Sequence, residues 1–144
     1  MSYVDICRKA QIKLGLDINV PIESGMFCAY DTKDEIIYVN LDDAVYQGEE
    51  FYSFVEELFA DARQFSLGFL SLLHEFGHHY DIMDYDAAED TILRMVADSV
   101  GYYRIPSEYA ATEWAVNFII QNRAKCEVIN ELFIKEEKAY FKNM

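Results

Sequence analysis

The chain has 144 residues, of which 52% are hydrophobic, and a formal net charge of −14 at pH 7. This length suits one domain over residues 1–144, and the hydrophobic content excludes a disordered chain. The negative charge would repel nucleic-acid phosphates, so we expect no nucleic-acid partner. No apolar run could span a bilayer, and the first residues lack a signal-peptide hydrophobic region, which predicts a cytoplasmic protein without a membrane partner.

The first forty residues predict a helix followed by a small antiparallel sheet. Tyr3–Leu14 has apolar residues at helical spacing. A loop bracketed by Pro21 and Gly25 follows it. Met26–Tyr30 and Glu35–Asn40 are two short runs rich in β-forming residues, and turn-forming residues separate them. This pattern predicts a β-hairpin.

The rest of the chain is predicted to be mostly helical. Glycine and proline are scarce, with six and two residues, which favours a helix-rich α+β fold. Asp42 or Asp43 is expected to cap a short helical turn. Longer helices are predicted over Glu49–Ala62, Gln64–Tyr80, Ala87–Tyr103, Ser107–Asn122 and Glu127–Phe141. In the helix over 87–103 we expect four side chains to face inward, namely Ile92, Met95, Val96 and Val100.

The helix over 64–80 carries the most informative motif of the chain, His74-Glu75-Phe76-Gly77-His78, which reads H-E-x-x-H. Residues four apart share one face of a helix, so His74 and His78 can bind one ion while Glu75 lies beside it. This helix is apolar on most sides and should be buried, where unpaired polar side chains are costly. The combination indicates a Zn²⁺ site that keeps a position open for water.

A catalytic zinc site needs a third protein ligand, and a downstream carboxylate is the remaining choice. The only other histidine of the chain is His79. Its side chain projects about 100° away from that of His78 around the helix, so we interpret it as a neighbour and not as a ligand. The candidates for the third ligand are Glu108 and Glu113, both within the helix predicted over 107–122.

These motifs resemble the ImmA/IrrE-type metallopeptidases, which are zincins often encoded by phages or mobile elements. That family has a strand, a helix with H-E-x-G-H and a later helix with E-x-x-A-N-x-F-A. Gly77 matches the first helix. The segment that begins at Glu108 matches the second helix through Ala111 and Trp114. The resemblance implies a minimal zincin fold and favours Glu108 as the third ligand. The chain departs from the pattern at Thr112, where the family has Asn or Asp.

The resemblance implies a zinc-dependent endopeptidase that hydrolyses a protein or peptide, for example a transcriptional repressor. His74, His78 and Glu108 would hold Zn²⁺, and no other cofactor is expected. Glu75 would act as the general base on the water. The strand over 36–40 would pair with an extended substrate by strand addition.

Other residues near the motif have two interpretations. Tyr102, Tyr103 or Arg104 could donate a hydrogen bond to the oxyanion, but packing is the commoner role for a tyrosine in a chain that has eleven. Asp81 could either orient a histidine or simply end the helix. The chain has no C-x-x-C pair, which predicts free packing thiols without a metal role at Cys7, Cys28 and Cys126.

Two functions of different classes fit the sequence. One is the zinc peptidase. The other is a zincin-fold protein of a phage or mobile element that binds and inhibits a host factor without cutting it. The intact Glu75 favours the enzyme, while the acidic composition favours a contact role with a basic partner. A structural metal site is a third interpretation, but such sites usually have four protein ligands.

Overall fold

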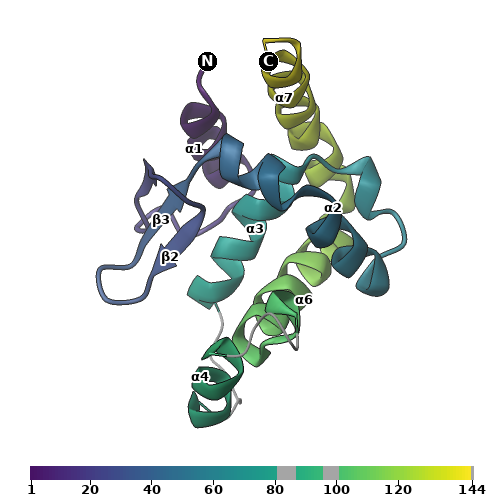
Figure 1. The fold of residues 1–144 in the computed structure, drawn as a ribbon. Coiled ribbons are helices and arrows are strands. Elements are labelled where there is room, and N and C mark those ends of the chain that lie inside the picture. Colours follow the sequence, from purple (N-terminus) through teal and green to yellow (C-terminus); the bar gives the residue numbers. More distant parts are fainter. Residues whose placement is uncertain (81–86, 96–100, 144) are drawn as a thin grey trace.

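The computed structural model describes residues 1–80, 87–95 and 101–143. Within these ranges the protein is α+β and mostly helical, with a small sheet that precedes a long central helix (Figure 1). No helix in the described ranges is long and apolar enough to cross a membrane. The helices are α1 (Tyr3–Lys13), α2 (Leu41–Leu58), α3 (Leu67–Tyr80), α4 (Ala87–Met95), α6 (Pro106–Gln121) and α7 (Arg123–Lys142), with 3-10 turns at Ala62–Gln64 and Tyr102–Arg104.

The sheet has three strands, β1 (Ile22–Ser24), β2 (Ala29–Asp31) and β3 (Ile36–Val39), in the order β1-β3-β2. The predicted hairpin is confirmed as the antiparallel pair of β2 and β3. The predicted loop over 21–25 is wrong, because part of it forms β1, which runs parallel to β3 and makes the sheet mixed. Three residues are too few to show an alternating pattern, so this strand could not be recognised without its partner.

The strand order also overturns the prediction that the strand over 36–40 pairs with a substrate. β3 lies between β1 and β2, so its backbone groups are engaged on both sides. Only a strand at the edge of a sheet can accept another strand. In the described chain the edges are β1, which borders α1, and β2, which borders α3.

Helix α2 begins earlier than predicted and bends in its middle. Asn40 caps it, because the Asn40 side chain accepts a hydrogen bond from the backbone N–H of Asp43 at 2.9 Å. The predicted cap at Asp42 or Asp43 is therefore wrong, and both residues lie in the first turn, where acidic side chains suit the helix dipole. The backbone leaves helical geometry at Gly48, where φ is +22°, and the helix ends at Leu58.

Helix α3 runs through the middle of the protein, with the sheet on one side and α6 on the other (Figure 1). It begins at Leu67, because the residues just before it form a 3-10 turn and a short extended link. All of its residues from Leu67 to Gly77 are buried, as the apolar sequence predicted. The helix that carries the motif is therefore also the centre of the hydrophobic core.

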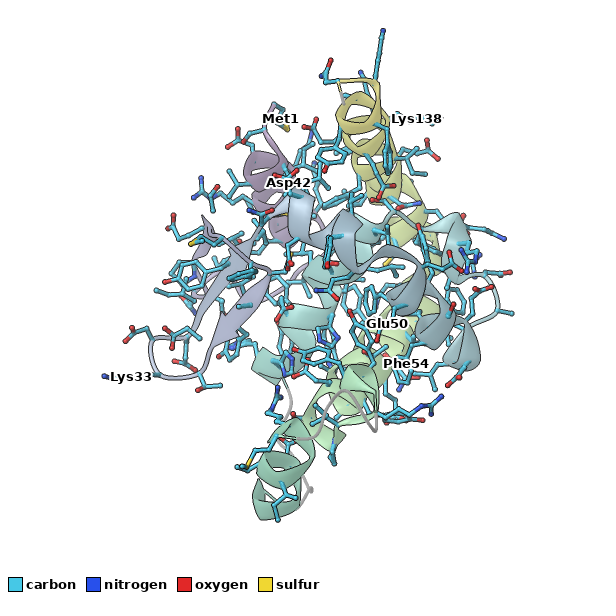
Figure 2. The ribbon with its side chains drawn as sticks, in the orientation of Figure 1. Met1, Lys33, Asp42, Glu50, Phe54 and Lys138 are labelled. Carbon is cyan, nitrogen blue, oxygen red and sulfur yellow. The ribbon has the colours of Figure 1, made fainter. Side chains whose placement is uncertain are left out.

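The elements around α3 place the chain ends on one side and the hairpin on another. α1 packs against α7, so the two termini lie at the same end of the protein (Figure 1). Lys33 marks the turn between β2 and β3 at the outer edge of the molecule (Figure 2). Glu50 and Phe54 mark the second half of α2, where Phe54 packs edge-on against Tyr109 of α6 (Figure 2).

The helix predicted over 87–103 is shorter in the structure, and its orientation differs from the prediction. α4 ends at Met95. Ile92 and Met95 were expected to face inward but are exposed, whereas Val96 and Val100 lie outside the described residues. The apolar pattern misled us because α4 makes polar contacts with α6 instead, through Asp90 and Arg94.

Candidate metal centre

The motif helix places its polar side chains on one face. His74 and His78 are one turn apart on α3, and the centroids of their rings are 4.9 Å from each other. Phe51 of α2 packs edge-on against the His74 ring. The two imidazoles therefore face the same region, as the spacing predicted.

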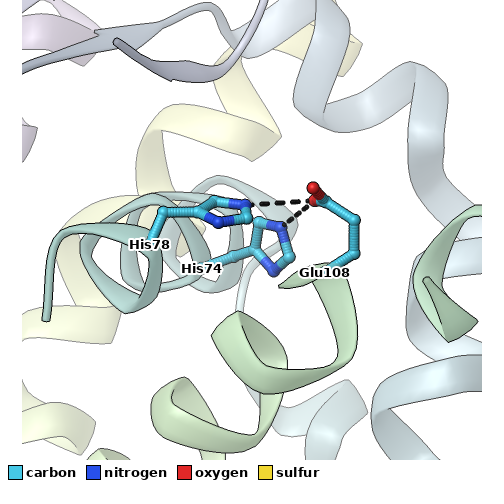
Figure 3. A group of neighbouring side chains, drawn as sticks. All are labelled: His74, His78 and Glu108. Carbon is cyan, nitrogen blue, oxygen red and sulfur yellow. Dashed lines mark hydrogen bonds and ion pairs between the residues drawn. The ribbon is translucent and has the colours of Figure 1, made fainter. Parts of the chain in front are cut away.

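Glu108, in the first turn of α6, completes the group (Figure 3). Its Oε1 lies 2.9 Å from Nε2 of His74 and 3.1 Å from Nε2 of His78. The three candidate ligand atoms all lie within 4.8 Å of one another. Bond lengths of about 2.0–2.1 Å place the ligands of a tetrahedral zinc about 3.3 Å apart, so small movements would fit this group to the ion. Glu113, the other candidate, is exposed and lies outside the group.

Gly77 allows the close contact between α3 and α6 that brings Glu108 to the histidines. A Cβ atom at this position would collide with the backbone oxygen of Ala111 and lie 2.8 Å from its Cα. Both are backbone atoms of α6, so the helix itself would have to move. The glycine in H-E-x-G-H is thus explained by helix packing, since only glycine has no Cβ.

Thr112 orients His74, although the family pattern has Asn or Asp at this position. The Thr112 hydroxyl donates a hydrogen bond to the backbone oxygen of Glu108 at 3.0 Å. Its oxygen lies 2.9 Å from Nδ1 of His74, so it accepts the Nδ1–H of that ring. A proton on Nδ1 leaves Nε2 of the neutral imidazole free to bind an ion. The Thr112 hydroxyl therefore supplies a hydrogen-bond acceptor for His74, although the chain lacks the Asn or Asp of the family pattern.

The sequence did not point to two further residues that hold Glu108 in place, Asp90 and Arg94. The Arg94 guanidinium donates to Oε2 of Glu108 at 2.5 Å, so it engages the oxygen that does not face the histidines. Asp90 pairs with Arg94 at 3.2 Å and accepts the backbone N–H of Ser107 at 2.8 Å. Their spacing of four residues was the only signal, and acid–base pairs at that spacing are common on surface helices.

Glu75 lies between two adjoining cavities. One of them, which we call the inner cavity, has a volume of about 270 Å³ and is bordered by His74 and α2. The other, which we call the outer cavity, has a volume of about 400 Å³ and is bordered by His78, Glu108 and β2. Three residues border both cavities, namely Cys28, Glu75 and Tyr102.

The Glu75 side chain is buried between the two cavities. Glu75 is only 6% exposed. No residue in the described part of the chain forms a hydrogen bond with its carboxylate. Burial raises the pKa of Glu75 above the usual 4.5. The negative charges of Glu108 and Asp43 raise this pKa further, whereas His74 and His78 lower it. A buried carboxylate with a raised pKa at a cavity is a frequent sign of a functional site.

Of the three candidate oxyanion donors, Tyr102 is the one that borders both cavities. Burial, followed by the negative charges of Glu108 and Glu75, raises the pKa of Tyr102, so its hydroxyl keeps its proton. Tyr103 stacks on the rings of Phe51 and Phe54, which is a packing role. Arg104 forms an ion pair with Glu57 at 2.8 Å and borders neither cavity.

The other residues singled out in the sequence lie outside the metal group. His79 contacts Asp17 through Nε2 and the Tyr30 hydroxyl through Nδ1, each at 2.9 Å, so it is a neighbour as predicted. Asp81 lies outside the described residues. All three cysteines are free, as predicted. Burial raises the pKa of Cys28 to about 12, which keeps this thiol protonated although it borders both cavities.

The group also has a defined charge pattern without metal. Burial alone would raise the pKa of Glu108, but the hydrogen bonds from His74 and His78 outweigh burial and lower it below the usual 4.5. Burial alone would lower the pKa of His78, but the Glu108 carboxylate outweighs burial and raises it above the usual 6.5. A proton on His78 therefore supplies the positive charge that a cation would supply.

We expect the metal-free protein to lose stability as the pH rises above 6.5, the ordinary pKa of His78. The raised pKa of His78 stabilises the folded state fully below that pH, and the contribution disappears as the folded ring deprotonates. The lowered pKa of Glu108 acts at the other end, since its contribution is present above 4.5 and is lost as the pH falls through the folded pKa.

Urea unfolding of chelator-treated protein at a series of pH values measures this trend. His78→Gln is the matched control and should flatten the decline above pH 6.5, the ordinary histidine value. Added Zn²⁺ should reverse the trend, because metal ligands must lose their protons to bind. A native metal-free protein that gains stability over this range relative to the variant would contradict the prediction.

Comparisons with known proteins do not assign the chain to a family. No family profile, no curated protein and no solved structure matches it.

Proposed function

We propose that the protein is a zinc-dependent endopeptidase of the ImmA/IrrE type, with a zincin-like fold and a protein substrate such as a transcriptional repressor. The Glu75 carboxylate is the observation that supports this most strongly. It is buried beside His74 and borders both cavities, and no described residue forms a hydrogen bond with it. A purely structural metal site does not require a buried carboxylate such as that of Glu75, whereas hydrolysis requires a base beside the ion.

Each residue of the site has a role in this proposal. His74, His78 and Glu108 would hold Zn²⁺, which when bound polarises a carbonyl and lowers the pKa of water to about 7. Glu75 takes a proton from the attacking water and gives it to the leaving amine. The raised pKa of Glu75 suits this exchange, because the protonated acid has to persist until the amine departs. The protonated Tyr102 hydroxyl is the candidate donor to the oxyanion.

The substrate backbone would pair with β2 and not with β3. Ala29 and Tyr30 of β2 border the outer cavity together with His78 and Glu108. In the described chain no strand pairs with the outer side of β2. An extended peptide added there would pass in front of the metal group.

The alternative function, inhibition of a host factor by binding alone, gains less support from the site. A contact role requires neither a buried carboxylate beside the histidines nor a protonated tyrosine at the same place. Both are present, in Glu75 and Tyr102. We therefore keep inhibition by binding as an outcome of the test and not as a second proposal.

The test compares the native protein with Glu75→Gln. We expect the native protein to bind Zn²⁺ and cleave members of a proteome-derived peptide pool and candidate repressors, with cleavage sites read by mass spectrometry. Glu75→Gln should lower kcat by about 10²–10⁴, the usual contribution of a general base, while the bound zinc measured by elemental analysis stays the same.

Glu113→Gln is the matched control, since it makes the same chemical change at an exposed position of α6. It should retain full activity. If zinc-loaded native protein cuts nothing and Glu75→Gln keeps the full biological effect, the protein is not a peptidase and acts by contact.

A further inference from the structure

The inner cavity is suited in size to one side chain. Ligand pockets usually measure about 300–1,000 Å³, so a cavity of about 270 Å³ is too small for a large ligand. It shares Glu75 and Tyr102 with the outer cavity, which contains the rest of the metal group. A side chain next to the bond that is cleaved could therefore enter it while the backbone stays in the outer cavity.

The walls of the inner cavity are apolar along the sides, with acceptors placed between them. Phe51 of α2 and Tyr103 of the 3-10 turn before α6 stack on each other, with ring centroids 4.9 Å apart, and together supply one aromatic wall. Asp43 borders the same space, and its Oδ2 accepts the backbone N–H of Cys28 at 2.9 Å, which fixes the carboxylate. Apolar walls with a fixed carboxylate suit the methylene stem and charged end of a basic side chain.

Ser71 provides an independent sign that the cavity takes a polar group. Ser71 is 7% exposed and borders the inner cavity from α3, one turn before Glu75. No residue in the described chain forms a hydrogen bond with its hydroxyl. The hydroxyl can therefore donate a hydrogen bond to, or accept one from, a polar group that enters the cavity.

The charge around the inner cavity determines whether a positively or a negatively charged ligand group is favoured there. α2, which supplies Asp43 and Phe51, has six acidic residues and no lysine or arginine. The ion pairs of this helix in the described structure use Arg63 and Arg104, which neutralise only its later acidic residues. Among the described residues that border the cavity, only His74 can carry a positive charge, and it belongs to the metal group. The field at the inner cavity therefore favours a cation.

We propose that the inner cavity is a specificity pocket that takes a lysine or arginine side chain of the substrate, next to the bond that is cleaved. This inference rests on the proposed peptidase function for its position and adds the class of substrate. The apolar stem of the side chain packs against the aromatic wall that the stacked rings of Phe51 and Tyr103 form together. Its charged end binds Asp43 and the Ser71 hydroxyl.

The experiment uses three pools of short peptides, blocked at both ends and randomised around one fixed residue, which is lysine, arginine or the uncharged norleucine. Zinc-loaded native protein should cleave the basic pools with a kcat/KM at least about tenfold above the norleucine pool, the effect of one charge-assisted hydrogen bond. Asp43→Asn should remove this preference but keep the zinc content, because the amide oxygen can still accept the Cys28 N–H. Ser71→Ala should weaken the preference partially.

Asp34→Asn is the matched control, because it removes the same charge from the turn that carries Lys33 (Figure 2), and Asp34 does not border the inner cavity. It should keep the preference. Equal cleavage of all pools would overturn the inference. So would an equal loss of the preference for the basic pools in Asp43→Asn and Asp34→Asn. Rates for the two basic pools show which side chain fits better.

Binding to the metal-free native protein separates this inference from the peptidase proposal, because it needs no cleavage and keeps Glu75. We expect the basic pools to bind at least about tenfold more tightly than the norleucine pool, with the difference lost in Asp43→Asn. Selective binding without any cleavage by the zinc-loaded protein would support the pocket and reject the peptidase. Equal binding, or no measurable binding of any pool, would reject the pocket.

Discussion

Replacing Glu108 with alanine should lower the affinity for Zn²⁺ more than about 100-fold, whereas Glu113→Ala should leave it unchanged. Removal of a residue that merely orients a ligand costs about 10–100-fold, so loss of a ligand itself should cost more. Glu108 is 2% exposed and contacts both histidines, while Glu113 is exposed on the same helix. Competition with a chromophoric chelator measures both affinities.

Glu108→Ala should also destabilise the metal-free protein. The change leaves His74 and His78 without their shared acceptor, and an unsatisfied buried polar group costs about 1–3 kcal/mol. Urea unfolding of both alanine variants gives the comparison, and Glu108→Gln separates loss of charge from loss of volume. A similar loss of zinc affinity in both alanine variants, or a larger one for Glu113→Ala, would show that the wrong carboxylate is assigned.

Gly77→Ala should both destabilise the protein and weaken zinc binding. The new methyl group would press against the backbone of Ala111, and such overpacking usually costs about 1–3 kcal/mol. Relief of the collision moves α6 away from α3, and Glu108 moves with it. We therefore expect the zinc affinity to fall although no ligand is changed.

Gly68→Ala is the matched control in the same helix. Its Cβ would meet the ring of Tyr3 at 2.9 Å and not the backbone of α6, so the strain arises far from the metal group. Gly68→Ala should lower the urea midpoint but keep the zinc affinity. If Gly77→Ala binds zinc as tightly as the native protein, the contact between the two helices does not position the third ligand.

Local patterns predicted the motif helix and the hairpin well. α3 has a long apolar run that is buried whatever its neighbours are, and the β2–β3 pair is formed by two runs separated by a short turn. The placement of His74, Glu75 and His78 on one face follows from the helix period alone. These features depend on residues close together in the sequence.

Features that depend on distant partners were not predictable in the same way. β1 exists because it pairs with β3, and α4 faces α6 through polar groups that resemble a surface pair in the sequence. Helical spacing alone left Glu108 and Glu113 equally open, and the motif resemblance was needed to favour one. The role of Thr112 could be found only once its distances to His74 and Glu108 were known.

The contact between Arg94 and Glu108 has a consequence for the chemistry of a bound ion. Arg94 engages Oε2, so only Oε1 of the carboxylate faces the imidazoles. A carboxylate that shares its electrons with a guanidinium donates less of them to a metal. A bound ion would then be a stronger Lewis acid than it would beside a free glutamate. Removal of this arginine should still lower the zinc affinity, because Arg94 also holds Glu108 in place.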